Sequence, residues 1–284
     1  MSESLKLSIS TPFRSFGTKG RFPDSVFGAG NAAKATYVDA LVAEIEGAAL
    51  DAQDMLVDEV EFVNGPASSL TTEQLERIMR AVRRNYRLAE GALIHATEVP
   101  GGLSVDYAGF CKNNHVEYLE IELLSADAMA LRAEKLPPAN DACVACYQVA
   151  YFTGAPKLGI LLDAGLDKGE RAFRASISQA LGRSPLFVRV IGAAGEGAGT
   201  RLKILQEMCS KHGMHQVDAG TLSATGTVVF GADGFAGMPG THANQIGCGL
   251  GAVSAFDGVR FKTTGDLAIY AAKSADFASI AHQL

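Results

Sequence analysis

Two glutamates, Glu120 and Glu122, lie two residues apart in a short apolar segment that is typical of a β-strand. Because side chains alternate between the two faces of a strand, we expect both carboxylates on the same face. Two inward-facing carboxyl groups have pKa values that move apart, which suits one for donating a proton and the other for accepting it. Asp163, at the end of a later apolar segment, is a third candidate for this acid–base chemistry. The alternative is that these carboxylates are solvated at the strand ends.

Basic residues gather near the N-terminus, where Arg14, Lys19 and Arg21 surround Gly17 and Gly20. Guanidinium and ammonium groups bind carboxylates and phosphates, so this stretch predicts a small anionic ligand. The alternative is a solvated basic loop. Three further candidate ligand-binding residues follow expected strands or precede the glycine-rich tail, and they are Asn64, Glu98 and His242.

Two other patterns are weaker indications of a site. Residues 195–199 (GEGAG) precede an expected helix, whose N-terminal N–H groups can bind an anion, but the segment matches neither a P-loop nor a dinucleotide-binding fingerprint. A connecting loop is the alternative. Cys143 and Cys146 form a C-x-x-C within a helical pattern, with no second pair at zinc-site spacing. We therefore interpret these cysteines as small core residues and expect no metal site.

Short apolar runs alternate with helical patterns, which is typical of strand–helix units around a parallel sheet. The helix that follows the second strand begins with Thr71 and Gln74 at the spacing of a capping box. Closed barrels of this class have eight strands, so the six units expected here predict an α/β fold with a partial TIM-like barrel over residues 1–212. Residues 213–284 are expected to form a small α+β extension packed on the barrel, ending in a helix over 265–284. The expected strands are 5–13, 57–63, 92–97, 116–123, 158–163 and 186–191.

The composition is that of a folded protein, with 284 residues, 48% hydrophobic content and a mean hydropathy of +0.12. The formal net charge is −6 and the basic residues are scattered, so the chain repels polyanions and nucleic acid is not an expected partner. The five cysteines are an odd number, which argues against a disulfide framework. Since neither a membrane-spanning run nor a signal-peptide pattern occurs, we expect a cytoplasmic protein without a membrane partner.

Short segments from the first expected strand to the tail form an ordered series: STPF at 10–13, YVDAL at 37–41, VEF at 60–62, NGP at 64–66, LTTEQL at 70–75, IGCGLGAVS at 246–254, DGVR at 257–260 and LAIY at 267–270. Their order and spacing resemble the oxygen-independent coproporphyrinogen III oxidase and heme-chaperone branch (HemN/HemW-like) of the radical S-adenosylmethionine (SAM) superfamily. The resemblance covers most of the chain. It implies that the partial barrel is of the radical-SAM type.

One segment departs from this family in the chemistry that matters most. The family binds an iron–sulfur cluster through C-x-x-x-C-x-x-C directly after its Pro-Phe pair, and the matching positions here are Arg14, Thr18 and Arg21. Neither a guanidinium nor a hydroxyl replaces a thiolate as a ligand of iron. The family's glycine-rich turn and its acidic residue also depart, at 63–67 (VNGPA) and at 97 or 98. The resemblance therefore implies a member without the cluster and without cleavage of S-adenosylmethionine.

Two main hypotheses follow. The first is a catalytically degenerate relative, a pseudoenzyme, that binds an anionic small molecule such as a heme or another tetrapyrrole, or that acts as the partner of a cluster-bearing homologue or as a homo-oligomer. The second is an enzyme that uses the barrel without a cluster for lyase or isomerase chemistry, through Glu120, Glu122, Glu98 or Asp163. A radical enzyme with displaced cluster ligands is a third alternative. The sequence leaves open whether the chain is an enzyme.

Overall fold

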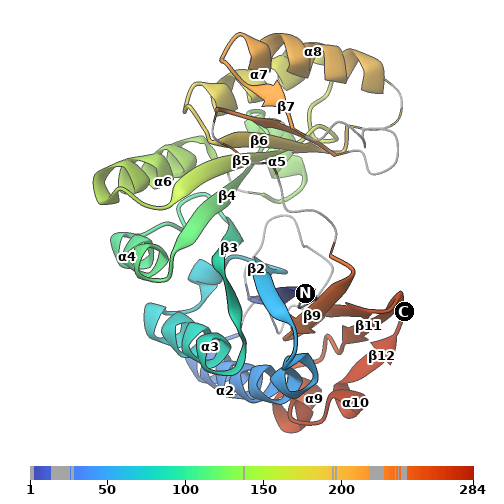
Figure 1. Cartoon of the computed structure of the whole chain (residues 1–284). Coiled ribbons are helices and arrows are strands. Elements are labelled where there is room, and N and C mark those ends of the chain that lie inside the picture. The colour runs from blue at the N-terminus through green and yellow to red at the C-terminus, as the bar shows by residue number, and fades with distance from the viewer. Residues whose placement is uncertain are drawn as a thin grey trace. The chain divides into compact units, whose positions relative to one another are not determined.

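The computed structural model describes residues 3–13, 26, 29–136, 138–193, 195, 197–217, 227–233, 235, 237 and 242–284. The chain forms two compact units, each of which is described by itself (Figure 1). Unit 1 comprises Met1–Glu98, Gly109–Glu117 and Gly240–Leu284, and unit 2 comprises Val99–Ala108 and Tyr118–Pro239. The domain boundary expected at residue 212 stays a prediction.

Unit 1 is built on a sheet whose described strands run in the order β12-β11-β10-β9-β1-β2-β3. β9, β1, β2 and β3 run parallel to one another, whereas β10 pairs antiparallel with β9 and β11, and β11 pairs antiparallel with β12. The tail therefore continues the sheet beside β1. The bounds are β1 Ser4–Ser10, β2 Leu56–Val63, β3 Leu88–Glu98, β9 Asn244–Cys248, β10 Val253–Phe256, β11 Val259–Thr263 and β12 Ala281–Gln283.

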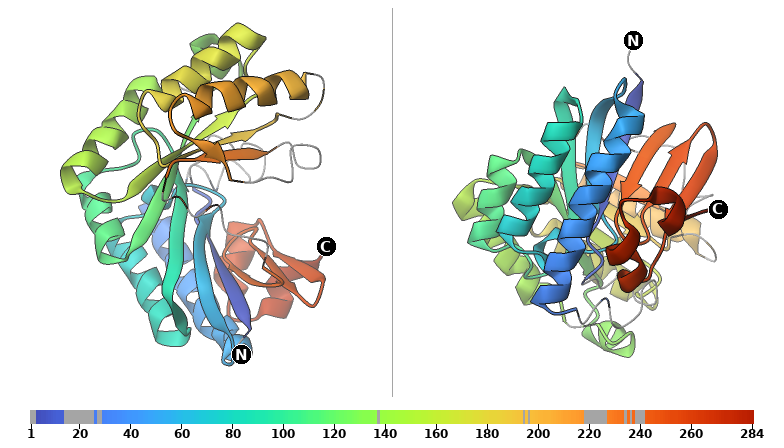
Figure 2. Two further views of the ribbon diagram at one scale, coloured as in Figure 1. Left: turned by 45° about the horizontal axis from the view of Figure 1, so that its top comes forward. Right: turned by 90° about the horizontal axis from the view of Figure 1, so that it is seen from below.

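Helices α2 (Asn31–Ala48) and α3 (Thr72–Asn85) lie side by side over one face of this sheet (Figure 2). Tyr37 of α2 is fully buried, and its hydroxyl donates to the carbonyl oxygen of Ser10 at 2.6 Å. The capping box predicted at the start of α3 is confirmed, because the Thr71 hydroxyl accepts from Gln74 N and the Gln74 amide oxygen accepts from Thr71 N. Between α2 and β2 the chain makes a short 3-10 helix, η1 (Ala49–Ala52), and another, η2 (Ala67–Ser69), follows β2.

The expected terminal helix over 265–284 is wrong. The segment instead forms α9 (Leu267–Lys273), α10 (Phe277–Ile280) and strand β12. Asp266 caps the N-terminus of α9, where its carboxylate accepts from Ala268 N and Ile269 N. A turn at residues 274–275, closed by the hydrogen bond from Asp276 N to the Lys273 carbonyl, interrupts the helical path. The last residues then pair with β11, which satisfies backbone groups along that strand.

Unit 2 contains the strands that are ordered β4-β5-β6-β8-β7 among the described residues. β4, β5 and β6 are parallel, as predicted, and β8 and β7 continue the sheet in antiparallel pairs. No helix among the described residues is long and apolar enough to cross a membrane. The strands are β4 Val116–Leu124, β5 Lys157–Asp163, β6 Phe187–Ile191, β7 His215–Gln216 and β8 Val228–Gly231. The helices are α4 Val105–Asn113, which belongs to both units, α5 Ala128–Ala133, α6 Asn140–Thr153, α7 Glu170–Leu181 and α8 Ala198–Ser210.

Candidate functional site

One face of the unit 1 sheet carries charged side chains. The parallel register pairs Lys6 of β1 with Glu59 of β2, and Ser8 with Glu61. Glu61 is in turn paired with His95 of β3. Because paired residues of neighbouring strands project from the same face, these five side chains form one surface, which we call the polar face. The residues that alternate with them are apolar and buried.

A buried carboxylate lies at the centre of the polar face. Glu59 is only 1% exposed, and its Oε1 lies 2.5 Å from Lys6 Nζ and 3.0 Å from His95 Nε2. Lys6 Nζ also lies 2.6 Å from Glu61 Oε2. Glu59 is therefore bonded to an ammonium and an imidazole, and the ammonium bridges two carboxylates.

These contacts fix the charge of the network. Burial alone would raise the pKa of Glu59, but hydrogen bonds from His95 and Lys6 and the charge of Lys6 outweigh it and lower that pKa. Burial alone would lower the pKa of Lys6, but the charge of Glu61 and the hydrogen bonds to both glutamates raise it. Both groups are consequently charged at neutral pH.

His242, a predicted ligand-binding residue, lies beside this network. Its Nδ1 is 3.4 Å from Glu59 Oε2, and its Nε2 is 2.9 Å from Asp58 Oδ1. Neither Glu59 Oε2 nor His242 Nδ1 makes a hydrogen bond with a described residue, although both atoms are buried. Buried polar atoms of this kind indicate a place where a water molecule or a ligand atom is bound.

Sequence reasoning singled out His242 but missed Lys6, Glu59, Glu61 and His95. A signal was present, since polar or charged residues recur at every second position in parts of these strands, between apolar residues. Which of them meet depends on the order β1-β2-β3 and on the register, which the sequence does not state.

Glu59, Glu61 and His95 each offer a ligand atom, and these atoms lie within 4.8 Å of one another. Carboxylate and imidazole ligands suit several divalent metals. Lys6 Nζ bonds both carboxylates, so the ammonium already supplies the positive charge between them. A metal ion would have to displace Lys6, and the expectation of no metal site stays a prediction.

Asn64 and Glu98 lie where β2 and β3 end. Glu98 is fully buried and accepts from the Ser68 hydroxyl at 2.6 Å and from Ser68 N at 3.2 Å. Asn64 has a positive φ of 66°, and its amide donates to Ser10 Oγ at 3.1 Å and to the Leu250 carbonyl at 3.3 Å. Both residues thus stabilise the chain segments next to the polar face. Their predicted ligand contacts remain predictions.

The predicted catalytic carboxylates lie in unit 2. Both oxygens of Glu120 are bonded to Arg189, with Arg189 Nε 2.6 Å from Oε1 and Nη2 paired with Oε2. Glu122 lies on the same strand and is 7% exposed, and the regular register from Glu120 to Glu122 puts both on one face. Asp163 ends β5, where its Oδ1 accepts from Gly165 N at 2.9 Å. The guanidinium of Arg189 thus occupies both carboxylate oxygens of Glu120.

Arg14, Lys19 and Arg21, the predicted anion-binding residues, lie outside the described residues. Their role stays a prediction that rests on the sequence.

Comparison with known proteins defines the fold. No protein-family model matches the sequence, and no curated protein matches it. Coproporphyrinogen III oxidase (HemN) from Escherichia coli, a radical SAM enzyme, matches with a TM-score of 0.75 and 18% sequence identity over 100% of this chain and 72% of that chain. TYW1 with a lysine-pyruvate adduct bound matches with a TM-score of 0.39 and 11% identity, over 62% of this chain and 57% of that chain. The FeFe-hydrogenase maturase HydG from Carboxydothermus hydrogenoformans matches with a TM-score of 0.38 and 14% identity, over 64% of this chain and 40% of that chain.

The match to HemN confirms the predicted α/β fold of radical-SAM type. The matched HemN is a radical SAM enzyme, and the iron–sulfur cluster of the family pattern described above is held by thiolates. All five cysteines of the chain are buried, and burial raises the pKa of Cys143 to about 11 and that of Cys209 to about 12. They lie on α4, α6, α8 and β9, and the groups of potential metal ligands among the described residues contain none of them. These thiols do not fit a cluster.

Proposed function

We propose that this chain is a HemN-like protein that works without an iron–sulfur cluster, as a binding protein for an anionic small molecule. The observation that carries the proposal is the combination of a HemN fold over the whole chain with five buried cysteines spread over separate elements. Arg14, Thr18 and Arg21 stand where cluster ligands are expected from the family pattern. In this proposal the chain has the fold of HemN but lacks the cysteine ligands of its iron–sulfur cluster.

The proposed ligand class is a tetrapyrrole with carboxylate side chains. The matched structure is a coproporphyrinogen III oxidase. Tetrapyrroles of this class combine an apolar macrocycle with several carboxylate groups. Arg14, Lys19 and Arg21 follow β1 in the sequence and provide the complementary charge. A role as partner of a cluster-bearing homologue uses the same scaffold.

Anaerobic reconstitution with iron and sulfide tests the loss of the cluster. We expect less than stoichiometric iron and sulfide after desalting, no cluster absorption, and no methionine or deoxyadenosine from S-adenosylmethionine. The E. coli HemN protein, treated in the same way, is the positive control. A stoichiometric cluster in this chain would refute the proposal.

Titration with coproporphyrin III, followed by its absorption and fluorescence, tests the ligand class. We expect saturable binding that is weakened about tenfold or more in the Arg14→Ala/Arg21→Ala double variant, because each charge-assisted hydrogen bond contributes about 1.5–3 kcal/mol. Lys168→Ala/Arg171→Ala removes the same charge from exposed positions of unit 2 and should bind normally. Equal losses in both double variants would reduce the effect to net charge and contradict a specific site.

A second candidate function is proton transfer at the polar face, and one observation favours it. Glu59 is buried and ionised, and its Oε2 and the neighbouring Nδ1 of His242 are buried atoms that make no hydrogen bond with a described residue, so both can contact a bound molecule. The proposal assigns this chemistry to Glu59 and His242, whereas both oxygens of Glu120 are bonded to Arg189. Mass spectrometry of the ligand recovered from the titration separates the candidates, since an unchanged ligand supports binding and a product that is lost in Glu59→Gln supports catalysis.

A further inference from the structure

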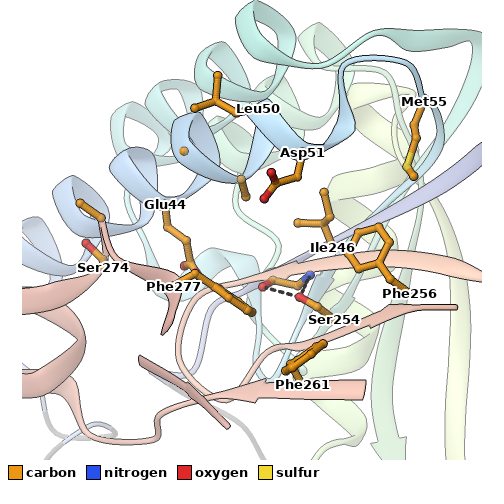
Figure 3. Close-up of a pocket in the computed structure, with 14 residues that line it drawn as sticks. Glu44, Leu50, Asp51, Met55, Ile246, Ser254, Phe256, Phe261, Ser274 and Phe277 are labelled. Atoms are coloured by element: carbon orange, nitrogen blue, oxygen red, sulfur yellow. Dashed lines mark hydrogen bonds between the residues drawn. The ribbon is translucent and has the colours of Figure 1, made fainter. Parts of the chain in front are cut away.

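A cavity of about 580 Å³ lies within unit 1, outside the polar face (Figure 3). It is lined by the end of α2, by η1 and by the tail segments β9 to α10, and it is open to solvent on one side. Its volume falls in the range of pockets that bind small molecules, about 300–1,000 Å³. Most of its lining is apolar, with Leu50, Met55, Ile246, Phe256, Phe261 and Phe277 as the large side chains.

Glu44 is the buried carboxylate in this lining, which also contains the buried Ser254 and Ser274, and only 3% of the surface of Glu44 is exposed. Its Oε2 accepts from the Tyr270 hydroxyl and from Gly249 N at 2.7 Å. Its Oε1 is buried and makes no hydrogen bond with any described residue. An unsatisfied carboxylate oxygen in an apolar cavity is costly, which indicates that a bound group completes it.

The charge of the lining selects the kind of group. Among the described residues that line the cavity, Glu44 and Asp51 are acidic and none is a lysine, arginine or histidine. A cation is therefore favoured in the cavity and an anion is opposed. Burial raises the pKa of Glu44 to about 7, so a cation that enters also shifts this carboxyl to its ionised form.

We propose that this cavity binds a small amphipathic amine, with its apolar body against the phenylalanine side chains and its ammonium paired with Glu44. The site is independent of the proposed tetrapyrrole site, because its charge preference is opposite and its residues are different. It therefore adds a second ligand class to the molecule.

Calorimetric titration of the full chain at pH 8 with n-octylamine tests the proposal, with 1-octanol and octanoate as probes of equal chain length. We expect saturable binding of octylamine, weaker binding of octanol, and binding of octanoate at least about tenfold weaker than that of the amine. Glu44→Gln should weaken octylamine about tenfold or more and leave octanol within about twofold.

A second variant keeps the test independent of Glu44. An added Cβ at Gly47 would meet no atom within 4 Å, so Gly47→Phe extends a ring into the cavity without a backbone clash and should abolish binding of all probes. Gly199→Phe is the matched control, since its Cβ position is equally open and lies on α8 of unit 2. Equal affinity for octanoate and octylamine, or full octylamine binding by Gly47→Phe, would overturn the proposal.

Discussion

Lys6→Met is expected to lower the free energy of unfolding by about 3–5 kcal/mol at pH 7, because it removes one partner of a buried ion pair. The methionine keeps most of the apolar stem of the lysine, so the loss comes mainly from the charge. Glu59 is 1% exposed, and after the loss of Lys6 its side-chain partners among the described residues would be His95 and His242. Urea denaturation followed by circular dichroism measures the change.

The pH dependence of this loss identifies its cause. In the wild-type protein the pKa of Glu59 is lowered, so its contribution is present above the unfolded pKa of about 4.3 and is lost as the pH falls through the folded pKa. Without Lys6, its hydrogen bond and its charge no longer oppose the effect of burial, so the pKa of Glu59 rises from its wild-type position. The stability that the ionised carboxylate contributes above the unfolded pKa is then reduced. The deficit of Lys6→Met should therefore grow from pH 4 to pH 7.

Two further variants complete this experiment. Lys262→Met replaces an exposed lysine on β11 and should change stability by less than about 0.5 kcal/mol. The double variant Lys6→Met/Glu59→Gln should recover part of the loss, because it removes the uncompensated charge. A deficit that is the same at pH 4 and pH 7 would mean that packing, and not the ion pair, connects Lys6 to the fold.

The sequence predicted the parallel strands because short, mainly apolar runs alternate along the chain with helical patterns. β4, β5 and β6 lie where they were expected. The tail was harder, since residues 281–283 form a strand only because β11 lies beside them. An alternating or helical pattern of apolar residues predicts the local secondary structure, but it does not predict which strand a segment will pair with.

For the candidate sites too, the sequence indicates the local position of a residue but not its contacts with distant segments. Glu44 follows Tyr37 by seven residues and Leu41 by three, so the helical period alone puts this carboxylate on the buried face of α2. The sequence thus contained a sign of an unusual group. The cavity forms between α2 and the tail strands, which are separated from α2 by most of the chain. The short motifs that resemble a known family do not predict that a cavity lies between these segments. The polar face likewise needs a register between strands.

Glu44→Gln is expected to remove a fall in stability that the wild-type protein shows between about pH 4.5 and pH 7. Burial raises the pKa of Glu44 from 4.5 to about 7, against the opposing hydrogen bonds from Tyr270 and Gly249. The folded protein thus retains a proton that the unfolded chain has released. Stability from this group is fully present below pH 4.5 and is lost as the pH rises through 7, by about 3 kcal/mol in total.

The buried ionisable groups next to Glu44 do not change charge in the pH range in which Glu44 titrates. Burial, as the main cause, raises the pKa values of Tyr37, Tyr270 and Cys248, so these groups stay neutral across the range. Asp51 lines the same cavity and is exposed. Glu46→Gln, at an exposed position of α2, is the matched control and should keep the wild-type pH dependence.

Octylamine connects this measurement to the cavity. At pH 8 the ammonium of bound octylamine compensates the ionised Glu44 carboxylate. A saturating amine should therefore raise the free energy of unfolding of the wild type by more than it raises that of Glu44→Gln, in which only linkage to binding contributes. Urea titrations at pH 5 and pH 8, with and without the amine, give all four values. If wild type and Glu44→Gln lose stability in parallel from pH 5 to pH 8, Glu44 does not titrate in this range, and the cavity has no buried charge to offer a cation.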